Sequence, residues 1–122
     1  YTRSDTLSLH DALPICKIVD GSIPSKKVYE DEKILAFYDL EPQAPVHVLV
    51  IPKEHICCAD AVNEENVGNI AHIFTKIPEI TKSLGLTNGY RIVNNCGEDG
   101  CQSVKHMHFH ILGGKKLNGT MA

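Results

Sequence analysis

The chain has 122 residues, of which 43% are hydrophobic and 22% are charged, and its formal net charge is −3. These values describe one globular domain and exclude a disordered chain. Basic residues form no stripe, no apolar run approaches the roughly 20 residues of a membrane helix, and the five cysteines match no disulfide framework. We therefore expect no nucleic-acid partner, no membrane partner and a reducing, cytoplasmic location.

Residues 1–14, YTRSDTLSLHDALP, share no pattern with the rest of the sequence. They resemble the translated adapter tail that occurs at the ends of proteins derived from uncleaned sequence assemblies. We expect residues 1–14 to be a non-native or disordered leader and residues 15–122 to form the domain.

The first half of the domain predicts a short helical turn followed by three strands. The turn covers residues 16–21 and ends at a glycine. Two strands, over residues 27–30 and 34–39, flank a tight connection, and a strongly apolar strand over residues 46–51 ends at Pro52.

The second half predicts one long helix and two further strands. Residues 63–65 should open the helix with acidic side chains in its first turn, Pro78 should kink it, and Gly85 should cap it. The strands follow over residues 90–94 and 104–112. Hairpin strands around one long and one short helix predict an α+β fold with an antiparallel sheet of about five strands. The apolar face of the long helix is spaced at helical intervals: Val67, Ile70, Ile73, Phe74, Ile77 and Leu84.

Three histidines alternate with apolar residues in the last predicted strand, His106-Met107-His108-Phe109-His110-Ile111. Because successive side chains of a strand point to opposite faces, His106, His108 and His110 should share one face at intervals of about 6.5 Å. This spacing allows the three imidazoles to surround one phosphate group and its waters.

This histidine row has three interpretations. A solvated strand face is the weakest, since three of the chain's seven histidines fall within five residues. A metal site and nucleophilic or acid–base chemistry at phosphorus are equally compatible with the spacing. The preceding loop, residues 94–103, favours a phosphate, because amide and hydroxyl donors and glycines allow close approach of an anion.

Together these segments resemble the histidine-triad (HIT) superfamily, in the Hint branch of purine nucleoside phosphoramidases, over about residues 16–114. The resemblance implies a nucleotide hydrolase that requires no cofactor and acts as a homodimer, with the sheets of two copies joined into one. The matching blocks are Lys17-Ile18-Val19, Ile23-Pro24, Phe37-Tyr38-Asp39-Leu40, Pro42-Gln43-Ala44-Pro45-Val46-His47, Leu49-Val50-Ile51-Pro52-Lys53-Glu54-His55 and Gly100-Cys101-Gln102-Ser103-Val104-Lys105-His106-Met107-His108-Phe109-His110.

The resemblance also implies catalytic roles. His108 would attack the α-phosphorus and carry a transient nucleotidyl group, with one ring nitrogen free and the other donating to a carbonyl. His110 and His47 would bracket the phosphate, and His47 would pass a proton to the leaving group. Gln102 and Ser103 match the donors to the phosphate and to the leaving amine.

The nucleotide-binding residues follow from the same resemblance. Asn95 matches a phosphate-contacting asparagine, and Asp39 matches the acid that binds the ribose hydroxyls. Three residues are candidate walls for a purine: Leu40, Ile18 and Phe37. Taken singly, Asp39 could instead start a turn, Asn95 could form an Asx turn, and His47 could be a satisfied core histidine.

Many bacterial relatives carry Cys-x-x-Cys at the amino end, where two histidines complete a structural zinc site. Here Cys16, His55 and His106 match three ligands, whereas the fourth position falls on Leu13, which cannot bind zinc. We expect this chain to bind zinc weakly or not at all, and a native segment with the missing cysteine would complete the site.

Cys101 stands where the family generally has glycine. Its side chain would narrow the approach to the phosphate and would be strained if the position needs a positive φ. The adjacent pair Cys57 and Cys58 receives no functional interpretation, and His72 is expected to be a surface residue.

The preferred hypothesis is therefore P–N cleavage of purine nucleoside phosphoramidates, which releases a nucleoside monophosphate and an amine. A dinucleoside-polyphosphate hydrolase or nucleotidyl transferase of another HIT branch is the alternative among enzymes, and the Gln102-Ser103 pair favours the Hint branch over it. A nucleotide-binding or zinc-stabilised interaction module without turnover is the alternative outside enzymes, and Cys101 is the feature that supports it.

Overall fold

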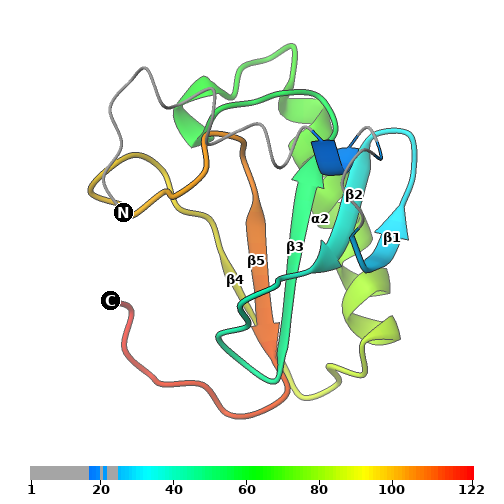
Figure 1. Cartoon of the computed structure of the whole chain (residues 1–122), viewed down its shortest axis with the longest axis vertical. Helices are drawn as coiled ribbons and strands as arrows, with labels where there is room; N and C mark the ends of the chain where they lie inside the picture. The colour runs from blue at the N-terminus through cyan, green and yellow to red at the C-terminus, as the bar shows by residue number, and fades with distance from the viewer. Residues whose placement is uncertain (1–16, 20, 22–24) are drawn as a thin grey trace.

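The computed structural model describes residues 17–19, 21 and 25–122, so the predicted leader and Cys16 lie outside the described residues (Figure 1). Residues 17–19 are helical, within the predicted turn. None of the described helices has the length and apolar character needed to cross a membrane. The longer elements are β1 (Lys27–Glu30), β2 (Ile34–Tyr38), β3 (Val46–Pro52), the 3₁₀ turn η2 (Ala59–Ala61), α2 (Val67–Ser83), β4 (Arg91–Val93) and β5 (Phe109–Gly113).

The five strands form one sheet in the order β1-β2-β3-β5-β4, and every neighbouring pair is antiparallel. The predicted α+β fold with an antiparallel sheet of about five strands is confirmed. The central strand β3 pairs with β2 on one side and with β5 on the other, while β1 and β4 form the edges of the sheet.

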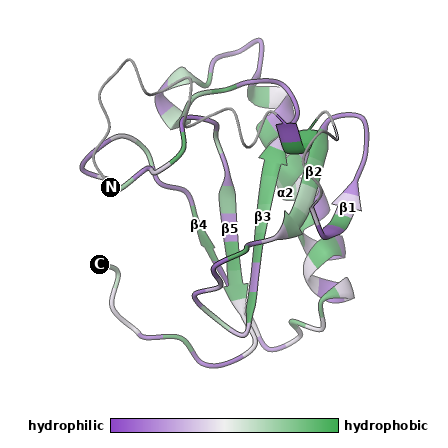
Figure 2. Cartoon of the chain, in the orientation of Figure 1, coloured by the Kyte–Doolittle hydropathy of each residue, from purple (hydrophilic) through white to green (hydrophobic). Residues whose placement is uncertain are grey.

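The alternation of side chains gives the sheet two different faces. Residues Val48, Val50 and Ile111 point to one face, where Ile73 and Ile77 of α2 pack against them in the main core. Helix α2 lies across this face behind β2 and β3, and hydrophobic residues dominate the central strands (Figures 1 and 2). The opposite face carries His47 and His110, together with a second apolar cluster built on Leu35, Phe37 and Ile51.

Helix α2 begins later than predicted, and the prediction of acidic residues in its first turn is wrong. The side chain of Asn63 accepts hydrogen bonds from the backbone N–H groups of Glu65 and Asn66, at 2.8 and 3.0 Å. This Asx-type turn holds both glutamates outside the helix, and Asn66 becomes the N-cap residue.

The carboxyl end of α2 confirms the predicted glycine cap. Gly85 has φ +76°, and its N–H donates to the carbonyl of Lys82, while Leu86 N–H donates to the carbonyl of Thr81. This pair of hydrogen bonds is a Schellman motif, which needs a left-handed residue at this position. Pro78 does not end the helix, which continues through it to Ser83 with Pro78 on the exposed side.

The last strand is shorter than predicted, because residues 104–108 lie outside the ladder and β5 begins at Phe109. In the antiparallel register, Met107 would face Pro52, which has no N–H to donate. Met107 N–H donates instead to the carbonyl of Ile56, at 2.6 Å. Likewise, the side chain of Asn94 donates to the carbonyl of His108 at 2.9 Å, just beyond the end of β4.

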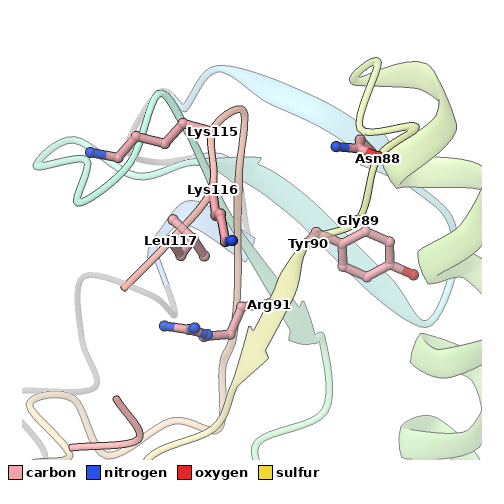
Figure 3. Close-up of a pocket in the computed structure, with 7 residues that line it drawn as sticks. All are labelled: Asn88, Gly89, Tyr90, Arg91, Lys115, Lys116 and Leu117. Carbon is pink, nitrogen blue, oxygen red and sulfur yellow. The ribbon is translucent and has the colours of Figure 1, made fainter. Parts of the chain in front are cut away.

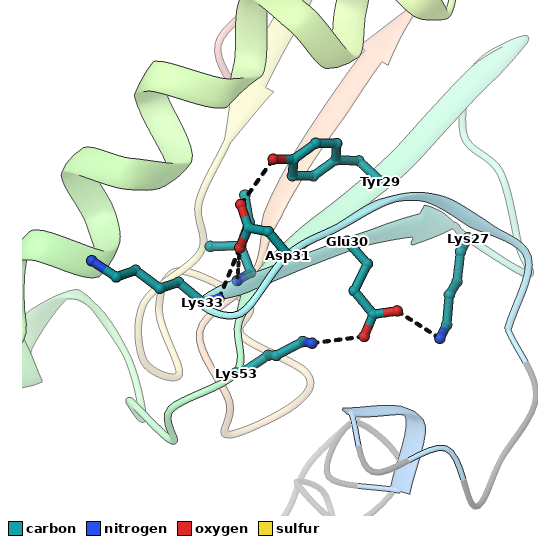
Figure 4. Close-up of polar contacts among 7 residues, drawn as sticks. Lys27, Tyr29, Glu30, Asp31, Lys33 and Lys53 are labelled. Carbon is teal, nitrogen blue, oxygen red and sulfur yellow. Dashed lines mark hydrogen bonds and ion pairs between the residues drawn. The ribbon is translucent and has the colours of Figure 1, made fainter.

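The tight connection between β1 and β2 is organised by the carboxylate of Asp31 (Figure 4). It accepts hydrogen bonds from the backbone N–H groups of Lys33 and Ile34 and from the hydroxyl of Tyr29. His72 of α2 lies 2.6 Å from the same carboxylate. His72 is partly exposed, so it lies at the surface as expected, and its contact with Asp31 holds its ring against this turn.

Candidate active site

Three imidazoles converge on the sheet face that lies opposite α2. The ring centroid of His110 is 5.1 Å from that of His47 and 5.1 Å from that of His108. His47 comes from β3 and His110 from β5, whereas His108 lies one residue before β5. Met107, Phe109 and Ile111 point into the main core, so the alternation of the segment extends beyond the ladder itself.

The ring of His108 is held in one tautomer by its own backbone. Its Nδ1 lies 2.7 Å from the carbonyl oxygen of His106, and this acceptor requires a proton on Nδ1. In the neutral ring, Nε2 therefore keeps its lone pair. A buried imidazole with an oriented free nitrogen is the form that attacks an electrophilic phosphorus.

His47 and His110 are linked by a hydrogen bond whose direction also follows from the backbone. Gln43 N–H donates to Nδ1 of His47 at 2.9 Å, so the proton of neutral His47 is on Nε2. This Nε2–H donates to Nδ1 of His110 at 2.8 Å. Neutral His110 consequently carries its own proton on Nε2, and the two rings form a short proton-sharing chain.

The environment favours the neutral form of these rings. Burial lowers the pKa of His110 to about 4, with further lowering from His108 and His47 that outweighs the attraction of Asp39. Burial also lowers the pKa of His47, against the opposing effect of Asp39. An anionic group placed among these rings would act in the other direction and favour their protonated forms.

The carboxylate of Asp39 lies next to the His47–His110 pair. One carboxylate oxygen accepts from Glu41 N–H at 2.7 Å, and the other lies 3.5 Å from Nε2 of His47. Asp39, His47 and His110 are close enough to share a metal ion. However, the 2.8 Å between the two imidazole nitrogens is a hydrogen-bond distance, shorter than the roughly 3.3 Å between two ligands of one tetrahedral zinc.

The three predicted purine walls are placed differently from one another. Phe37 is buried in the second apolar cluster, and Ile18 packs against that cluster from the first helical turn. Leu40 is 95% exposed and projects from the end of β2 into solvent. The structure therefore brings Ile18 and Phe37 together and leaves Leu40 apart.

The loop before the triad uses its amides internally. The side-chain N–H groups of Gln102 donate to the carbonyls of Cys57 and Val104, at 2.7 and 2.9 Å, and its oxygen accepts from Gly97 N–H. Both side-chain hydrogens of Gln102 are thus engaged. Asn95 donates to the carbonyl of Gly100 at 2.7 Å and keeps one N–H, whereas Ser103 is exposed.

Among the residues matched to a zinc site, the structure brings together two. The Nδ1 atoms of His55 and His106 lie 3.2 Å apart, and Nε2–H of His106 donates to the carbonyl of Pro52. Their spacing fits two ligands of one tetrahedral ion. Cys16 lies outside the described residues, and Leu13 offers no ligand atom, so the set remains incomplete in this chain.

The turn that precedes the triad confirms the suspected strain at Cys101. Its φ is +60°, and it is the one non-glycine residue with positive φ in the part of the chain that the structure describes. A β-carbon is disfavoured in this region. At the neighbouring Gly100, an added β-carbon would collide with the backbone carbonyl of Cys96.

Asn94 makes a contact with the site that the histidine motif did not predict. Its donation to the carbonyl of His108 fixes the backbone that carries the ring, although the predicted strand ended at this residue. Only its position next to Asn95 in the loop could have suggested a role.

A cavity of about 230 Å³ lies away from the histidines (Figure 3). It is formed where β4 begins and where the chain passes after β5, and none of the predicted site residues lines it. Its lining residues are Asn88, Gly89, Tyr90, Arg91, Lys115, Lys116 and Leu117.

Comparisons with known proteins identify the family of this fold. The family model described as "HIT domain" matches residues 20–117. A 14 kDa zinc-binding protein of Zea mays is 44% identical over 104 residues, which cover 84% of this chain and 81% of the relative. A histidine triad protein from Clostridium difficile superposes with a TM-score of 0.85 and 48% identity, covering 90% of this chain and 96% of that one.

A third relative is a HIT family hydrolase from Legionella pneumophila. It is 42% identical and superposes with a TM-score of 0.83, over 86% of this chain and 95% of the other. Family model, sequence identity and fold coincide over the segment that carries the converging histidines. The chain therefore belongs to the HIT family.

Proposed function

We propose that this protein is a nucleotide hydrolase that cleaves the P–N bond of purine nucleoside phosphoramidates, with Nε2 of His108 as the nucleophile. The observation that carries the proposal is the 2.7 Å bond from Nδ1–H of His108 to the carbonyl of His106, which leaves Nε2 free beside His110. The name of the Legionella relative, a HIT family hydrolase, supports the reaction class.

The first half-reaction transfers the nucleotidyl group to the enzyme. The Nε2 lone pair of His108 attacks the α-phosphorus, a P–N bond to His108 forms, and the P–N bond to the leaving amine breaks. The amine leaves with a proton supplied by the His47–His110 pair, whose protonated form is favoured by the bound phosphate anion. The hydroxyl of Ser103 donates a hydrogen bond to the leaving nitrogen.

The second half-reaction restores the enzyme. The His47–His110 pair accepts a proton from water, which attacks phosphorus and breaks the P–N bond to His108. The products of both steps are a nucleoside monophosphate, an amine and unchanged protein, with one water consumed.

Substrate binding uses the same sheet face. The carboxylate of Asp39 accepts from the ribose hydroxyls, and the purine lies against Ile18 and Phe37. Leu40, which projects into solvent, would have to move toward this cluster to cover the purine. Asn95 contacts the phosphate through its remaining N–H. Gln102 reaches the phosphate only if its side chain rotates, because its side-chain hydrogens and its backbone N–H are already engaged.

The zinc set of Cys16, His55 and His106 plays no part in this reaction. The donors fit zinc in kind, and the two imidazole nitrogens fit it in spacing, but the first ligand position is occupied by Leu13. Zinc would therefore act here only as a structural ion, bound weakly, and no step passes through it.

The proposal includes a homodimer in a reducing cytoplasm. Strand β4 is an edge of the sheet, so its outer backbone groups can pair with β4 of a second copy. Two partly exposed aromatic residues, Phe74 and Tyr90, lie on α2 and just before β4. The four cysteines of the described part are free thiols, which fits a reducing compartment.

The decisive variant is His108→Asn. An asparagine amide can replace the Nδ1–H donor to the carbonyl of His106 but supplies no second nitrogen. We expect turnover of adenosine phosphoramidate to fall at least 1,000-fold, a magnitude like that of losing a catalytic nucleophile, while AMP binding is retained. Acid-quenched wild-type protein should carry one nucleotidyl group by mass spectrometry. Unchanged turnover in the variant would remove His108 as the nucleophile.

The substrate class is tested separately by a steady-state comparison of adenosine phosphoramidate with diadenosine triphosphate. Faster cleavage of the triphosphate would favour a dinucleoside-polyphosphate hydrolase. AMP binding without turnover of either substrate would favour a binding module. The strained Cys101, in the loop of residues 94–103, is the feature that favours this alternative.

A further inference from the structure

A second cluster of metal-binding side chains lies outside the histidine site. The Sγ atoms of Cys58 and Cys96 and a carboxylate oxygen of Asp60 all lie within 4.8 Å of one another. Cys58 and Asp60 belong to the segment around η2, whereas Cys96 belongs to the loop that follows β4. The two sulfurs are thus 38 positions apart in sequence and adjacent in space.

The backbone around the cluster is held by a single bridging side chain. The carboxamide of Gln102 donates to the carbonyl of Cys57 at 2.7 Å and accepts from Gly97 N–H at 3.0 Å. These two residues are the immediate neighbours of Cys58 and Cys96. Gln102 is itself buried, so it joins the two segments from inside and sets the two thiols beside each other before any ion is bound.

A backbone hydrogen bond also fixes the segment that leads into η2. Ile56 accepts from Met107 N–H, and Ile56 is fully packed in the main core. Cys58 therefore lies two residues from a backbone position that is fixed in the core. On the other side of the cluster, the loop that contains Cys96 is held by the hydrogen bond from Gln102 N–H to the carbonyl of Gly97. The donor positions are preorganised by contacts that do not involve the thiols.

The donor set selects a class of ion. Two thiolates and one carboxylate suit a thiophilic divalent cation such as Zn²⁺ rather than Mg²⁺ or Ca²⁺, which prefer oxygen. Two sulfurs bound to one tetrahedral zinc lie about 3.8 Å apart, a separation within the observed limit of 4.8 Å. Both thiols are half-buried and Asp60 is exposed, so an ion can enter and a water can complete the coordination.

We propose that Cys58, Asp60 and Cys96 form a binding site for one Zn²⁺-class cation, with a water as the fourth ligand. This site shares no residue with the set Cys16, His55 and His106. The ion would cross-link the η2 segment to the loop that contains Asn95. The inference does not depend on the proposed hydrolase reaction, because it rests on donor geometry alone.

The test uses the full chain, reduced and metal-free, with Cys16→Ala as the background so that the other set contributes no thiolate. Titration with Co²⁺ should produce a sulfur-to-metal charge-transfer band with a stoichiometry of one ion per chain. Competition with a chromogenic chelator then gives the affinity for Zn²⁺. Cys58→Ser and Cys96→Ser should each lower that affinity at least about tenfold and weaken the band, and Asp60→Asn should lower the affinity with the band retained.

Matched controls are available in the same two segments. Cys57→Ser alters the thiol next to Cys58, and Cys101→Ser alters the exposed thiol of the Cys96 loop, and neither should change the affinity or the band. Asp60 is exposed, so Asp60→Asn should fold normally even if a cysteine variant does not. The proposal is overturned if Co²⁺ gives no charge-transfer band, if the control variants weaken binding as much as the cluster variants, or if Asp60→Asn binds like the background. A Cys58–Cys96 disulfide in protein that binds no Zn²⁺ after reduction would also overturn it.

Discussion

The ring of His108 is oriented by the residue two positions before it, because its Nδ1 lies 2.7 Å from the backbone carbonyl oxygen of His106. Both residues precede the first residue pair of β5, so no hydrogen bonds of the sheet fix their backbone. The contact between the ring of His108 and the carbonyl of His106 fixes the ring instead. The direction in which the free nitrogen points is therefore set by the path of the chain.

The histidine tautomers can be measured directly. We predict the Nδ1–H form for His108 and the Nε2–H form for His47 and His106, because each ring's partners require these protons. Long-range ¹H–¹⁵N correlation spectra at neutral pH distinguish the two forms for each ring. An Nε2–H form for His108 would contradict its assignment as the nucleophile.

Asn94 should position His108 rather than take part in the chemistry. Replacing Asn94 with alanine removes the 2.9 Å hydrogen bond to the carbonyl of His108 and loosens the segment that carries the ring. We expect kcat for phosphoramidate hydrolysis to fall about tenfold with little change in KM. Asn88→Ala, at an exposed asparagine, is the control and should leave both constants unchanged. A change in KM alone would point to a substrate contact instead.

The low pKa of His110 should make stability depend on pH. Burial and the neighbouring histidines lower it to about 4, so between about pH 6.5 and pH 4 the unfolded chain binds a proton at this residue that the folded chain does not. The free energy of unfolding should fall as the pH falls through this window. Urea unfolding of His110→Asn, which keeps an acceptor for His47, should show a smaller slope. Equal slopes would contradict the assignment.

Asp31 should stabilise the protein in a different pH window. Burial raises the pKa of this carboxyl, but hydrogen bonds from His72, Lys33 N–H, Ile34 N–H and Tyr29 outweigh it and lower the pKa. The stabilisation is therefore present above the unfolded value of about 3.9 and is lost as the pH falls below it.

The Asp31→Asn substitution tests this contribution. We expect it to reduce the free energy of unfolding at neutral pH by about 1–2 kcal/mol, because charge-assisted hydrogen bonds to His72 and Tyr29 are weakened. The exposed neighbour Glu32 provides the control, and Glu32→Gln should change the free energy by less than about 0.5 kcal/mol. Equal effects of the two substitutions would show that Asp31 has no special role.

Cys101→Gly should stabilise the folded protein. Relief of the positive φ is worth about 1–2 kcal/mol, and the greater freedom of glycine in the unfolded chain offsets part of this gain. A net increase of about 0.5–1 kcal/mol in the free energy of unfolding is expected from chemical denaturation. Cys101→Ala removes the thiol but keeps the β-carbon, so it should give no comparable gain, and an equal gain would assign the effect to the thiol.

The parts of the fold that were predicted from sequence are those with local signals. A tight connection located β1 and β2, and an apolar run that ends at a proline located β3. Gly85 located the end of α2, because only a left-handed residue closes that motif. The start of β5 could not be found in this way. It depends on Pro52, a residue of another strand that cannot donate to Met107.

The same distinction applies to the site. The histidine row was visible because its members are spaced two apart, and the family resemblance supplied His47. In contrast, the bond between His72 and Asp31 joins residues 41 positions apart, and the cluster of Cys58 with Cys96 depends on how two loops meet. No periodic pattern in the sequence encodes such pairs.

Gly100 and Cys101 are neighbours that tolerate change to different degrees. A side chain at Gly100 would strike the carbonyl of Cys96, which is rigid backbone, whereas the side chain at Cys101 reaches solvent and meets only a torsional penalty. Most side chains at position 101 would thus leave the path of the loop intact, whereas any β-carbon at position 100 would force the backbone around Cys96 to shift.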